Sequence, residues 1–201
     1  MTEATARSQL TKRRILDVAA RRFREQGYAA VSLRSIAKAA NMQAGSLYYH
    51  FASKEDLVCE ILNQGIDAVH EEVRRSVEAV AGSQRSVIFR AAIRAHLKSL
   101  LRQSDYTSAN VRIFGQVPEA VRKRCLATRR AYEEFWDKLL SGLRDDGALQ
   151  SKADVRAARL LILGALNASL DWFDPKRGGV EALADQYADL IWNGFDGMSK
   201  Q

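Results

Sequence analysis

The 201-residue sequence contains only two prolines, two cysteines and three histidines, and no stretch shows the alternating β-branched pattern of strands. Scarce proline and the missing strand pattern favour helices over sheets. The histidines, His50, His70 and His96, lack the spacing of a zinc site. A GxSxG motif, a GxGxxG motif after a strand and a phosphate-binding loop are all missing. We therefore expect an all-α protein that is not an enzyme and needs no metal or cofactor.

No apolar stretch of the sequence is long enough to cross a membrane. The longest one, Leu160–Leu170, has about half the length that a membrane-spanning helix needs, and it contains Asn167 and Ser169. The opening residues, MTEATARSQLTKRR, lack the apolar core of a signal peptide. We therefore expect a cytoplasmic protein with no membrane partner.

The two cysteines, Cys59 and Cys125, lie far apart in predicted helices and lack the spacing of metal ligands. In a reducing cytoplasm such residues are usually buried thiols. We expect buried thiols here, with a redox switch as the alternative.

Positive charge is concentrated at the N-terminal end of the chain. The first 50 residues hold nine Lys or Arg against three acidic residues, a balance of +6, whereas the whole chain carries +7. The rest of the chain therefore contributes only +1. A basic module joined to a nearly neutral body is typical of a protein that binds a polyanion such as nucleic acid. A basic solvated helix face would account for Arg21–Arg24 alone, but not for the whole excess.

Residues 32–54, SLRSIAKAANMQAGSLYYHFASK, predict two short helices that meet at a tight turn. Ser32 is a good N-cap for the first helix. Leu33 and Ile36 begin an apolar stripe at helical spacing, which predicts one buried face. Asn41 tolerates the left-handed backbone conformation that a sharp turn needs, so we expect the first helix to end there.

The second short helix is predicted from about Gln43 to His50. Its inward face is expected to consist of Ala44, Leu47 and Phe51. Two adjacent tyrosines, Tyr48 and Tyr49, are then left facing solvent, which is costly unless they contact a partner. A helix-turn-helix whose second helix enters the major groove of DNA supplies such a partner.

The segment from Ile15 to Val58 closely resembles the DNA-binding domain of the tetracycline-repressor (TetR) family of bacterial one-component regulators. The resemblance includes an amphipathic first helix, the pair Gly27-Tyr28, a serine at the start of the second helix, and LYYHF followed by Lys-Glu-Asp-Leu. It is specific because many residue types recur at fixed spacing. The rest of the chain resembles the family only in length and in being helical. A helical hairpin without a nucleic-acid role is the alternative for this segment.

The resemblance implies a three-helix DNA-binding domain in residues 8–54 and a helical effector-binding and dimerisation domain in residues 55–201. We expect about nine helices in all. The first should end at Gly27, and the seventh should run from Pro118 to about Arg144. Gln can hydrogen-bond adenine and Ala can contact a thymine methyl group, so we expect bases to be read by Gln43, Ala44, Ser46 and Tyr48. By resemblance, the phosphates are assigned to Tyr49, His50 and Lys54, and to Ser32 and Arg34 from the helix before.

The last two predicted helices have the composition of an oligomer interface. The first of them is apolar nearly all round, which requires burial on more than one side. We expect the interface to contain Leu163, Leu166, Leu170, Tyr187, Leu190 and Ile191. Packing inside the monomer is the alternative on the residues alone, but the resemblance implies a homodimer, because TetR-family proteins dimerise through a four-helix bundle of these helices. A dimer would read a palindromic double-stranded operator, with recognition helices roughly 34–36 Å apart.

Aromatic and polar residues mingle in the predicted helices of the second domain. An apolar pocket with a few polar groups is the expected lining of a small-molecule site, and the candidates are Asn110, Phe114, Trp136, Asn167 and Trp172. Filling of the core is the alternative for each of them. The second domain is weakly similar to family members that respond to acyl-CoA or fatty-acid-like ligands, which makes an acyl-CoA the first candidate effector. Aromatic drugs and other hydrophobic metabolites are the alternatives.

These observations together predict a homodimeric transcriptional regulator, a repressor released from its operator by a small hydrophobic effector. An architectural DNA-binding protein without an effector is the competing class, and the large, nearly neutral second domain argues against it. A helical interaction module that does not bind DNA conflicts with the asymmetry of charge.

Overall fold

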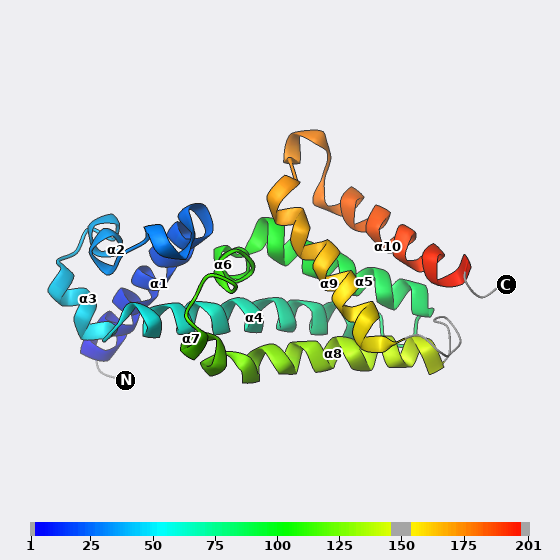
Figure 1. The fold of residues 1–201 in the computed structure, drawn as a ribbon, viewed down its shortest axis with the longest axis horizontal. Helices are drawn as coiled ribbons and strands as arrows, with labels where there is room; N and C mark the ends of the chain where they lie inside the picture. The colour runs from blue at the N-terminus through cyan, green and yellow to red at the C-terminus, as the bar shows by residue number, and fades with distance from the viewer. Residues whose placement is uncertain (1–2, 146–153, 198–201) are drawn as a thin grey trace. The chain divides into compact units, whose positions relative to one another are not determined.

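The computed structural model describes residues 3–145 and 154–197, and over these residues all regular structure is helical (Figure 1). The α-helices in these two ranges are α1 (Glu3–Ala30), α2 (Leu33–Ala39), α3 (Ala44–His50), α4 (Lys54–Glu78), α5 (Arg85–Lys98), α6 (Asp105–Ile113), α7 (Glu119–Arg124), α8 (Leu126–Asp145), α9 (Val155–Trp172) and α10 (Val180–Gly197). A π-helical segment (Ser99–Gln103) follows α5, and a 3-10 turn (Pro175–Arg177) precedes α10. The all-α fold is confirmed. Within the described ranges no helix is long and apolar enough to cross a membrane.

The described residues form ten α-helices where about nine were expected, because one predicted helix is divided. A single helix was expected from Pro118 to Arg144, but α7 ends and α8 begins at Cys125. The backbone of Cys125 has φ −96° and ψ 0°, and its N–H donates to the carbonyl oxygens of Val121 and Arg122. Neither glycine nor proline lies at this break, so no local residue signals it.

The predicted end of the first helix at Gly27 is confirmed as a kink inside α1. Gly27 has φ 77° and ψ 176°, a conformation that only glycine adopts easily. A Cβ atom at this position would also lie 2.9 Å from the side-chain oxygen of Gln116. The next residue, Tyr28, donates its N–H to that oxygen over 2.9 Å. This hydrogen bond links the end of α1, just after the kink, to the segment that follows α6.

The first of two compact units contains the described residues up to Ile66 together with Asp105–Thr128. Its core takes apolar side chains from α1, α2, α3, the start of α4, and α6, including the fully buried Phe23, Ile36, Leu47 and Ile61. α6 packs along α1, where Tyr106 donates from its hydroxyl to Asp17 over 2.6 Å and Arg24 pairs with Asp105 over 2.8 Å. The division into compact units does not test where the DNA-binding domain ends. The predicted boundary after residue 54 therefore stays a prediction.

Close approach of α4 and α6 within this unit depends on Gly65. A Cβ atom at Gly65 would overlap the backbone carbonyl of Tyr106. The side chains of Thr107 and Asn110 then reach the α4 backbone, donating to the carbonyl oxygens of Gly65 (3.1 Å) and Leu62 (2.7 Å). These two hydrogen bonds satisfy buried polar groups at a contact between helices.

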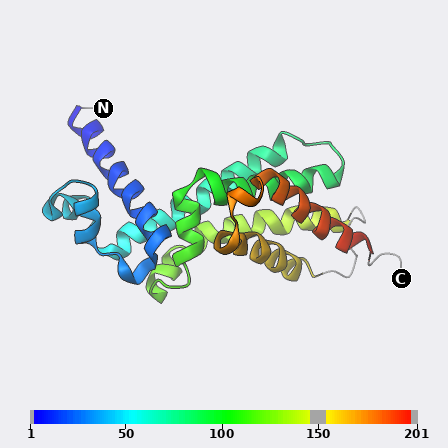
Figure 2. The same cartoon turned by 90° about the horizontal axis from the view of Figure 1, so that it is seen from above.

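The second compact unit contains Asp67–Ser104 and the described residues from Arg129 onward. α10 lies along α5 (Figure 2). Arg90 pairs with Asp185 and Asp189 across this contact, and Arg94 pairs with Asp185 over 2.6 Å. The two arginines hold the pKa of the Asp185 carboxyl below its usual range, with the hydrogen bond from Arg94 as the largest cause.

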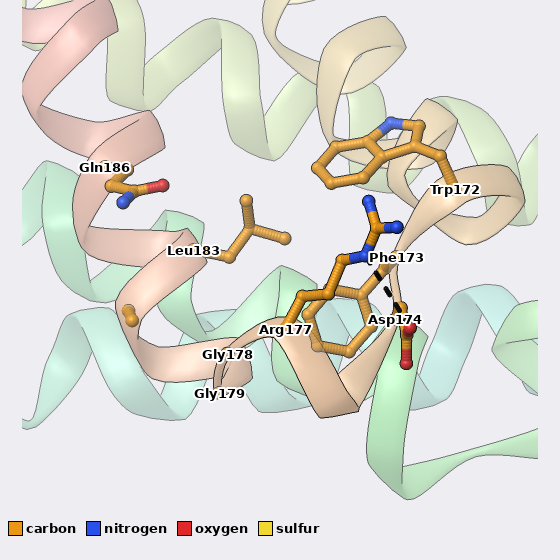
Figure 3. Close-up of a pocket in the computed structure, with 9 residues that line it drawn as sticks. Trp172, Phe173, Asp174, Arg177, Gly178, Gly179, Leu183 and Gln186 are labelled. Atoms are coloured by element: carbon orange, nitrogen blue, oxygen red, sulfur yellow. Dashed lines mark ion pairs between the residues drawn. The ribbon is translucent and has the colours of Figure 1, made fainter.

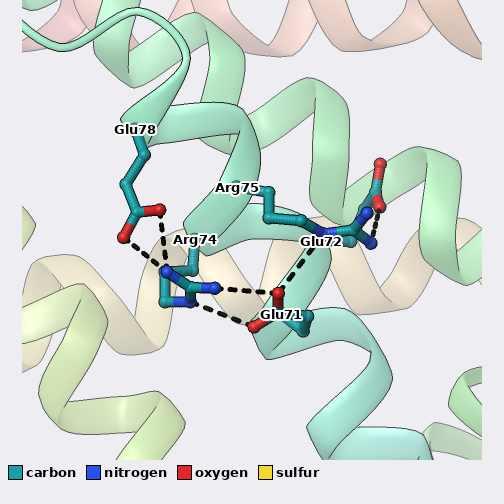
Figure 4. A network of polar contacts seen from close by, with 5 residues as sticks. All are labelled: Glu71, Glu72, Arg74, Arg75 and Glu78. Carbon is teal, nitrogen blue, oxygen red and sulfur yellow. Dashed lines mark hydrogen bonds and ion pairs between the residues drawn. The ribbon is translucent and has the colours of Figure 1, made fainter.

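The part of α4 that belongs to the second unit carries a network of ion pairs on its surface (Figure 4). Arg74 pairs with Glu71 (2.8 Å) and Glu78 (2.6 Å), and Arg75 pairs with Glu72 (2.8 Å). Pairs at three- and four-residue spacing stabilise a helix locally. This stretch of α4 is therefore held helical partly by its own side chains.

Candidate nucleic-acid interface and effector site

The helix-turn-helix is built by local side-chain caps, as its sequence predicts. Ser32 accepts the N–H of Ser35 on its hydroxyl oxygen (3.1 Å), and Ser35 accepts the N–H of Ser32 in return (3.1 Å). This reciprocal pair begins α2. Asn41 then takes the left-handed conformation, with φ 50°, and α3 starts one residue after Gln43. The two helices and the tight turn between them are confirmed.

The second helix of this motif, α3, divides its side chains between core and solvent. Leu47 is fully buried and Phe51, which follows the helix, is 3% exposed. Tyr48 and Tyr49 are 56% and 82% exposed, although large aromatic side chains are usually covered in a folded protein. Gln43 and Ser46 are exposed as well. The outward face is therefore exposed to solvent, as the sequence predicts.

Other residues assigned to DNA lie at the edges of this face. Ala44 and His50 are half-buried, with Ala44 packed against the core of the unit. Arg34 is exposed on α2, and Ser32 is exposed although its hydroxyl already serves as the helix cap. All the predicted base-reading residues thus lie on α3 or, in the case of Gln43, at its N-cap. Their contacts with bases and phosphates remain predictions.

Lys54 has an internal role that the sequence did not reveal. Its ammonium group donates to the carbonyl oxygen of Tyr28 over 2.6 Å and lies 3.8 Å above the centre of the Tyr28 ring. It also lies 5.9 Å from the ring of Phe23. Partial burial lowers the pKa of Lys54, and the charge of Glu55 opposes this effect. Lys54 therefore fixes the start of α4 against the end of α1, and its assignment to a phosphate stays a prediction.

The five residues predicted to line the effector site do not come from one compact unit. Asn110 and Phe114 belong to the first unit. There Asn110 is buried with its amide bonded to Leu62, and Phe114 packs against the core. Both therefore have structural roles in the first unit. The sequence could not separate them from the other three, because mixed aromatic and polar residues occur in both units.

Trp136 and Asn167 meet around a buried histidine in the second unit. His96 is 3% exposed, with one ring nitrogen 2.8 Å from the hydroxyl of Tyr132 and the other 3.1 Å from the side-chain oxygen of Asn167. The ring of Trp136 lies edge-on, 6.4 Å from the His96 ring. Burial lowers the pKa of His96 to about 4, and the hydrogen bond to Asn167 opposes the shift. His96 is therefore neutral at ordinary pH.

Trp136 carries an unsatisfied donor inside this cluster. Its side chain is fully buried, and within the described residues its indole Nε1 makes no hydrogen bond of ordinary geometry, with the Tyr132 ring edge-on at 6.4 Å as its polar neighbour. Buried polar groups normally find a partner, so each exception needs an explanation. The cluster of His96, Tyr132, Trp136 and Asn167 therefore presents polar groups within an apolar interior. His96 was missed as its centre, because the sequence does not show which helices bring these residues together.

Trp172 lines a different feature, a surface concavity of about 220 Å³ in the second unit (Figure 3). Its other walls come from the loop before α10 and from the first turns of α10, with Phe173, Arg177, Leu183 and Gln186 among the lining residues. Arg177 is 3.9 Å from Asp174 across this concavity. Trp136 and Asn167 are not among its lining residues. The structure thus places Trp172 apart from the buried cluster.

The predicted dimer surface requires one correction. Leu166 is fully buried inside the chain, on the same α9 stripe as Arg159, Ile162 and Ser169, so it has no surface to offer a second copy. Its place in the interface was wrong because helical spacing shows which residues share a face, but not which of two apolar faces turns inward. The other predicted residues have accessible surface: Leu190 is 71% exposed, whereas the half-buried ones are Leu163, Leu170, Tyr187 and Ile191.

The opposite face of α9 is both apolar and exposed. Leu160, Leu161 and Trp172 are 57%, 66% and 54% exposed, and Gly164 and Ala168 lie exposed between them at helical spacing. Ser169 of α9 donates to the hydroxyl of Tyr187 over 3.3 Å, which ties α9 to α10. Large exposed apolar patches mark interaction surfaces. We call the exposed residues Leu160, Leu161, Gly164, Ala168 and Leu190 the α9–α10 face.

Comparison with known proteins covers both parts of the chain. Residues 15–61 match the family model for bacterial regulatory proteins of the tetR family. Residues 88–195 match the model for the tetracyclin repressor-like C-terminal domain. The HTH-type transcriptional repressor KstR2 of Rhodococcus jostii is 31% identical over 193 residues, which cover 90% of this chain and 89% of that protein.

Two solved structures share the fold over most of the chain. AibR in complex with isovaleryl coenzyme A and operator DNA has a TM-score of 0.81 and 26% identity, covering 90% of this chain and 98% of that one. The TetR-family regulator PfmR of Thermus thermophilus has a TM-score of 0.76 and 28% identity, covering 89% of this chain and 94% of that one.

The buried histidine predicts how stability depends on pH. Because the pKa of His96 is about 4 in the folded protein and roughly 6.5 in an unfolded chain, only the unfolded chain takes up this proton as the pH falls between those values. Stability is therefore full above pH 6.5 and decreases below it, by about 2 kcal/mol at pH 5. Urea unfolding at pH 7.5 and pH 5 measures the loss.

Other groups titrate in the same range, so variants isolate the contribution of His96. His96→Gln should lose about 2 kcal/mol less than the wild type between the two pH values. His70→Gln should remove a smaller part of the loss, because partial burial lowers the pKa of His70 as well. An identical pH response in His96→Gln and the wild type would show that His96 is not the group responsible.

Proposed function

Because the chain belongs to the TetR family of DNA-binding transcriptional regulators, we propose that it is a homodimeric repressor that a small hydrophobic effector releases from a palindromic operator. The observation that supports DNA binding is the outward face of α3. Tyr48 and Tyr49 are exposed there, while Leu47 of the same helix is buried in the core. Since its target is chromosomal DNA, we place its action in the cytoplasm. No catalytic step is part of this proposal.

Different side chains are proposed to specify and to position the complex. Gln43, Ala44, Ser46 and Tyr48 contact base edges, and these contacts carry sequence information. Tyr49, His50, Arg34, Ser32 and Lys54 contact phosphates and fix the register. Arg34 is the cleanest representative of the second group, because it is exposed, whereas Lys54 also holds α1 against α4.

Gln43→Ala and Arg34→Ala separate the two roles. We expect Gln43→Ala to relax preference at one operator position by about 1–3 kcal/mol, because one bidentate base contact is lost. Arg34→Ala should weaken binding to operator and scrambled DNA alike and reduce the salt slope by about 1 per subunit. Fluorescence anisotropy over a range of salt concentrations measures both, after the operator has been identified by genomic footprinting. Equal losses on both DNAs for both variants would contradict the division.

The α9–α10 face is proposed to bind a second copy of the chain. Leu160, Leu161 and Leu190 leave more than half of each side chain in water, and exposed Gly164 and Ala168 on α9 permit a second helix to approach closely. Pairing these helices across a two-fold axis would bury this area in a four-helix bundle, as the family resemblance implies. Two recognition helices then read two half-sites, which one short helix cannot specify alone.

Leu161→Arg is expected to give monomers with sharply reduced operator affinity, because it places a charge in the proposed bundle. Leu10→Arg is the matched control, since Leu10 is 70% exposed and lies on α1, outside this face. Leu166→Arg is unsuitable, because it would disrupt the core of the monomer. Sedimentation equilibrium gives the result, and an intact Leu161→Arg dimer would move the interface elsewhere.

The effector is proposed to bind in the second unit at the His96 cluster, with an acyl-CoA as the first candidate. Three observations support this site: Trp136 has an unsatisfied donor, His96 is neutral, and Asn167 shares the cluster. A thioester carbonyl would supply the acceptor that Trp136 lacks. The similarity to AibR, whose structure contains isovaleryl coenzyme A and operator DNA, supports the same ligand class.

Release requires that the effector prefer a conformation in which the recognition helices no longer fit the operator. α4 is the proposed lever, because only three residues separate it from α3 and its residues from Asp67 onward belong to the second unit. The coupling must be reciprocal, so operator DNA weakens effector binding by the same factor. An architectural DNA-binding protein would show no such response.

Trp136→Phe should leave operator affinity intact while weakening acyl-CoA-induced release about 2–10-fold, the value of one lost hydrogen bond. Trp172→Phe is the control for the surface concavity and should respond like the wild type. The measurement is a titration of the DNA complex with isovaleryl-CoA, longer acyl-CoAs, free fatty acids and aromatic drugs. A complex unchanged by all of these would refute effector release, and a loss confined to Trp172→Phe would move the site to the concavity.

A further inference from the structure

The structure brings together two cysteines that are distant in the sequence. Cys59 lies on α4 and Cys125 lies at the break between α7 and α8, and their sulfur atoms are 3.3 Å apart. Both are buried, with 7% and 3% exposure. Burial of the thiols was expected, but their contact was not. Since a disulfide has a sulfur–sulfur distance of about 2.05 Å, the pair is a dithiol in this structure.

We propose that Cys59 and Cys125 are a modification site that hydroperoxides oxidise to an intramolecular disulfide, and that this bond lowers affinity for DNA. Formation of the disulfide does not depend on the proposed function. Only the predicted loss of DNA affinity rests on the proposed function. Forming the bond requires the sulfurs to approach by about 1.3 Å. Cys125 is well placed to move, because it is the non-helical residue between two helices.

The concavity beside Cys59 gives an oxidant access to one sulfur. It has a volume of about 450 Å³, and its walls include Cys59, Asp56 and Arg124. Arg124 pairs with Asp56 over 2.9 Å. The pKa of Arg124 is raised, first by this hydrogen bond and then by the charge of Cys59. The carboxylate of Glu60 lies in the same wall. Cys59 lines this concavity and Cys125 does not, so Cys59 is the sulfur that reacts first with a hydroperoxide.

The proposed reaction has two steps and consumes one hydroperoxide. The Cys59 thiolate attacks the outer oxygen of R–O–O–H, so that the O–O bond breaks, a sulfenic acid forms and ROH leaves after taking up a proton. The Cys125 sulfur then attacks the sulfenic sulfur, the S–S bond forms and water leaves. Overall, two thiols and ROOH give one disulfide, ROH and water. Each sulfur loses one electron and the hydroperoxide gains two.

The position of the pair connects this chemistry to the recognition helix. The same concavity is lined by His50 and Phe51, the end of α3 and the residue after it. Asp56, which holds Arg124, also accepts the hydroxyl of Ser53 (2.7 Å) at the start of α4. Drawing Cys125 toward α4 moves Arg124, its direct neighbour in the chain, and so disturbs the contacts that set the start of α4. Lower DNA affinity follows.

The first readout is chemical and uses the full-length protein. Hydrogen peroxide or cumene hydroperoxide should consume both thiols of the chain, which has only two cysteines. Peptide mapping without reductant should recover a Cys59–Cys125 link, and dithiothreitol should restore both thiols. Cys59→Ser and Cys125→Ser should each yield no intramolecular link. Retention of both thiols, a link only between two chains, or sulfinic acid without any link would overturn the proposal.

The second readout is operator affinity. The oxidised wild type should bind at least about tenfold more weakly, a difference near 1.4 kcal/mol, and reduction should restore binding. Cys59→Ser should bind alike before and after treatment. A disulfide without any change in affinity would overturn the regulatory part of the proposal. If the reduced wild type bound no operator at all, the proposed function would fail, while the chemical readout would still decide whether the disulfide forms.

Discussion

The placement of α3 depends on one partly buried hydrogen bond, which the ammonium group of Lys54 donates to the carbonyl oxygen of Tyr28. Three segments meet there. The kink at Gly27 turns the chain so that Tyr28 faces α4, and Gln116 accepts the Tyr28 N–H from the segment after α6. A charged donor on a carbonyl, backed by an aromatic ring, is among the stronger contacts available to a partly buried lysine. α3, which ends shortly before Lys54, inherits its orientation from this junction.

Local features of the fold could be predicted from the sequence, and tertiary contacts could not. The cap at Ser32, the turn at Asn41 and the kink at Gly27 are dictated by the backbone preferences of single residues, so their positions were correct. The break at Cys125 and the inward face of Leu166 depend on neighbours from distant parts of the chain. For the same reason the sequence could not show that two of the five candidate effector residues, Asn110 and Phe114, belong with the first unit.

The second unit contains buried polar groups of two kinds, a neutral histidine and a charged arginine. His96 is neutral and shares hydrogen bonds with two uncharged partners, so it adds no net charge to the interior. Arg159 remains charged at 7% exposure because Asp137 accepts its Nε–H over 2.7 Å and Glu133 lies 3.5 Å away. Paired charges keep their positions, whereas a neutral cluster can exchange hydrogen-bond partners at lower cost. This difference favours the His96 cluster over the Arg159 pair as the proposed effector site.

The ion pairs along the surface of α4 make salt a second variable for a regulator that reads DNA. Dissolved ions screen exposed pairs such as Arg74–Glu71 and Arg75–Glu72. They also weaken every contact between a protein and phosphates. The first effect lowers the local stability of α4 only slightly, because exposed pairs contribute little. For a DNA-binding regulator, added salt therefore acts mainly where the protein meets the phosphates, and only weakly within its own helices.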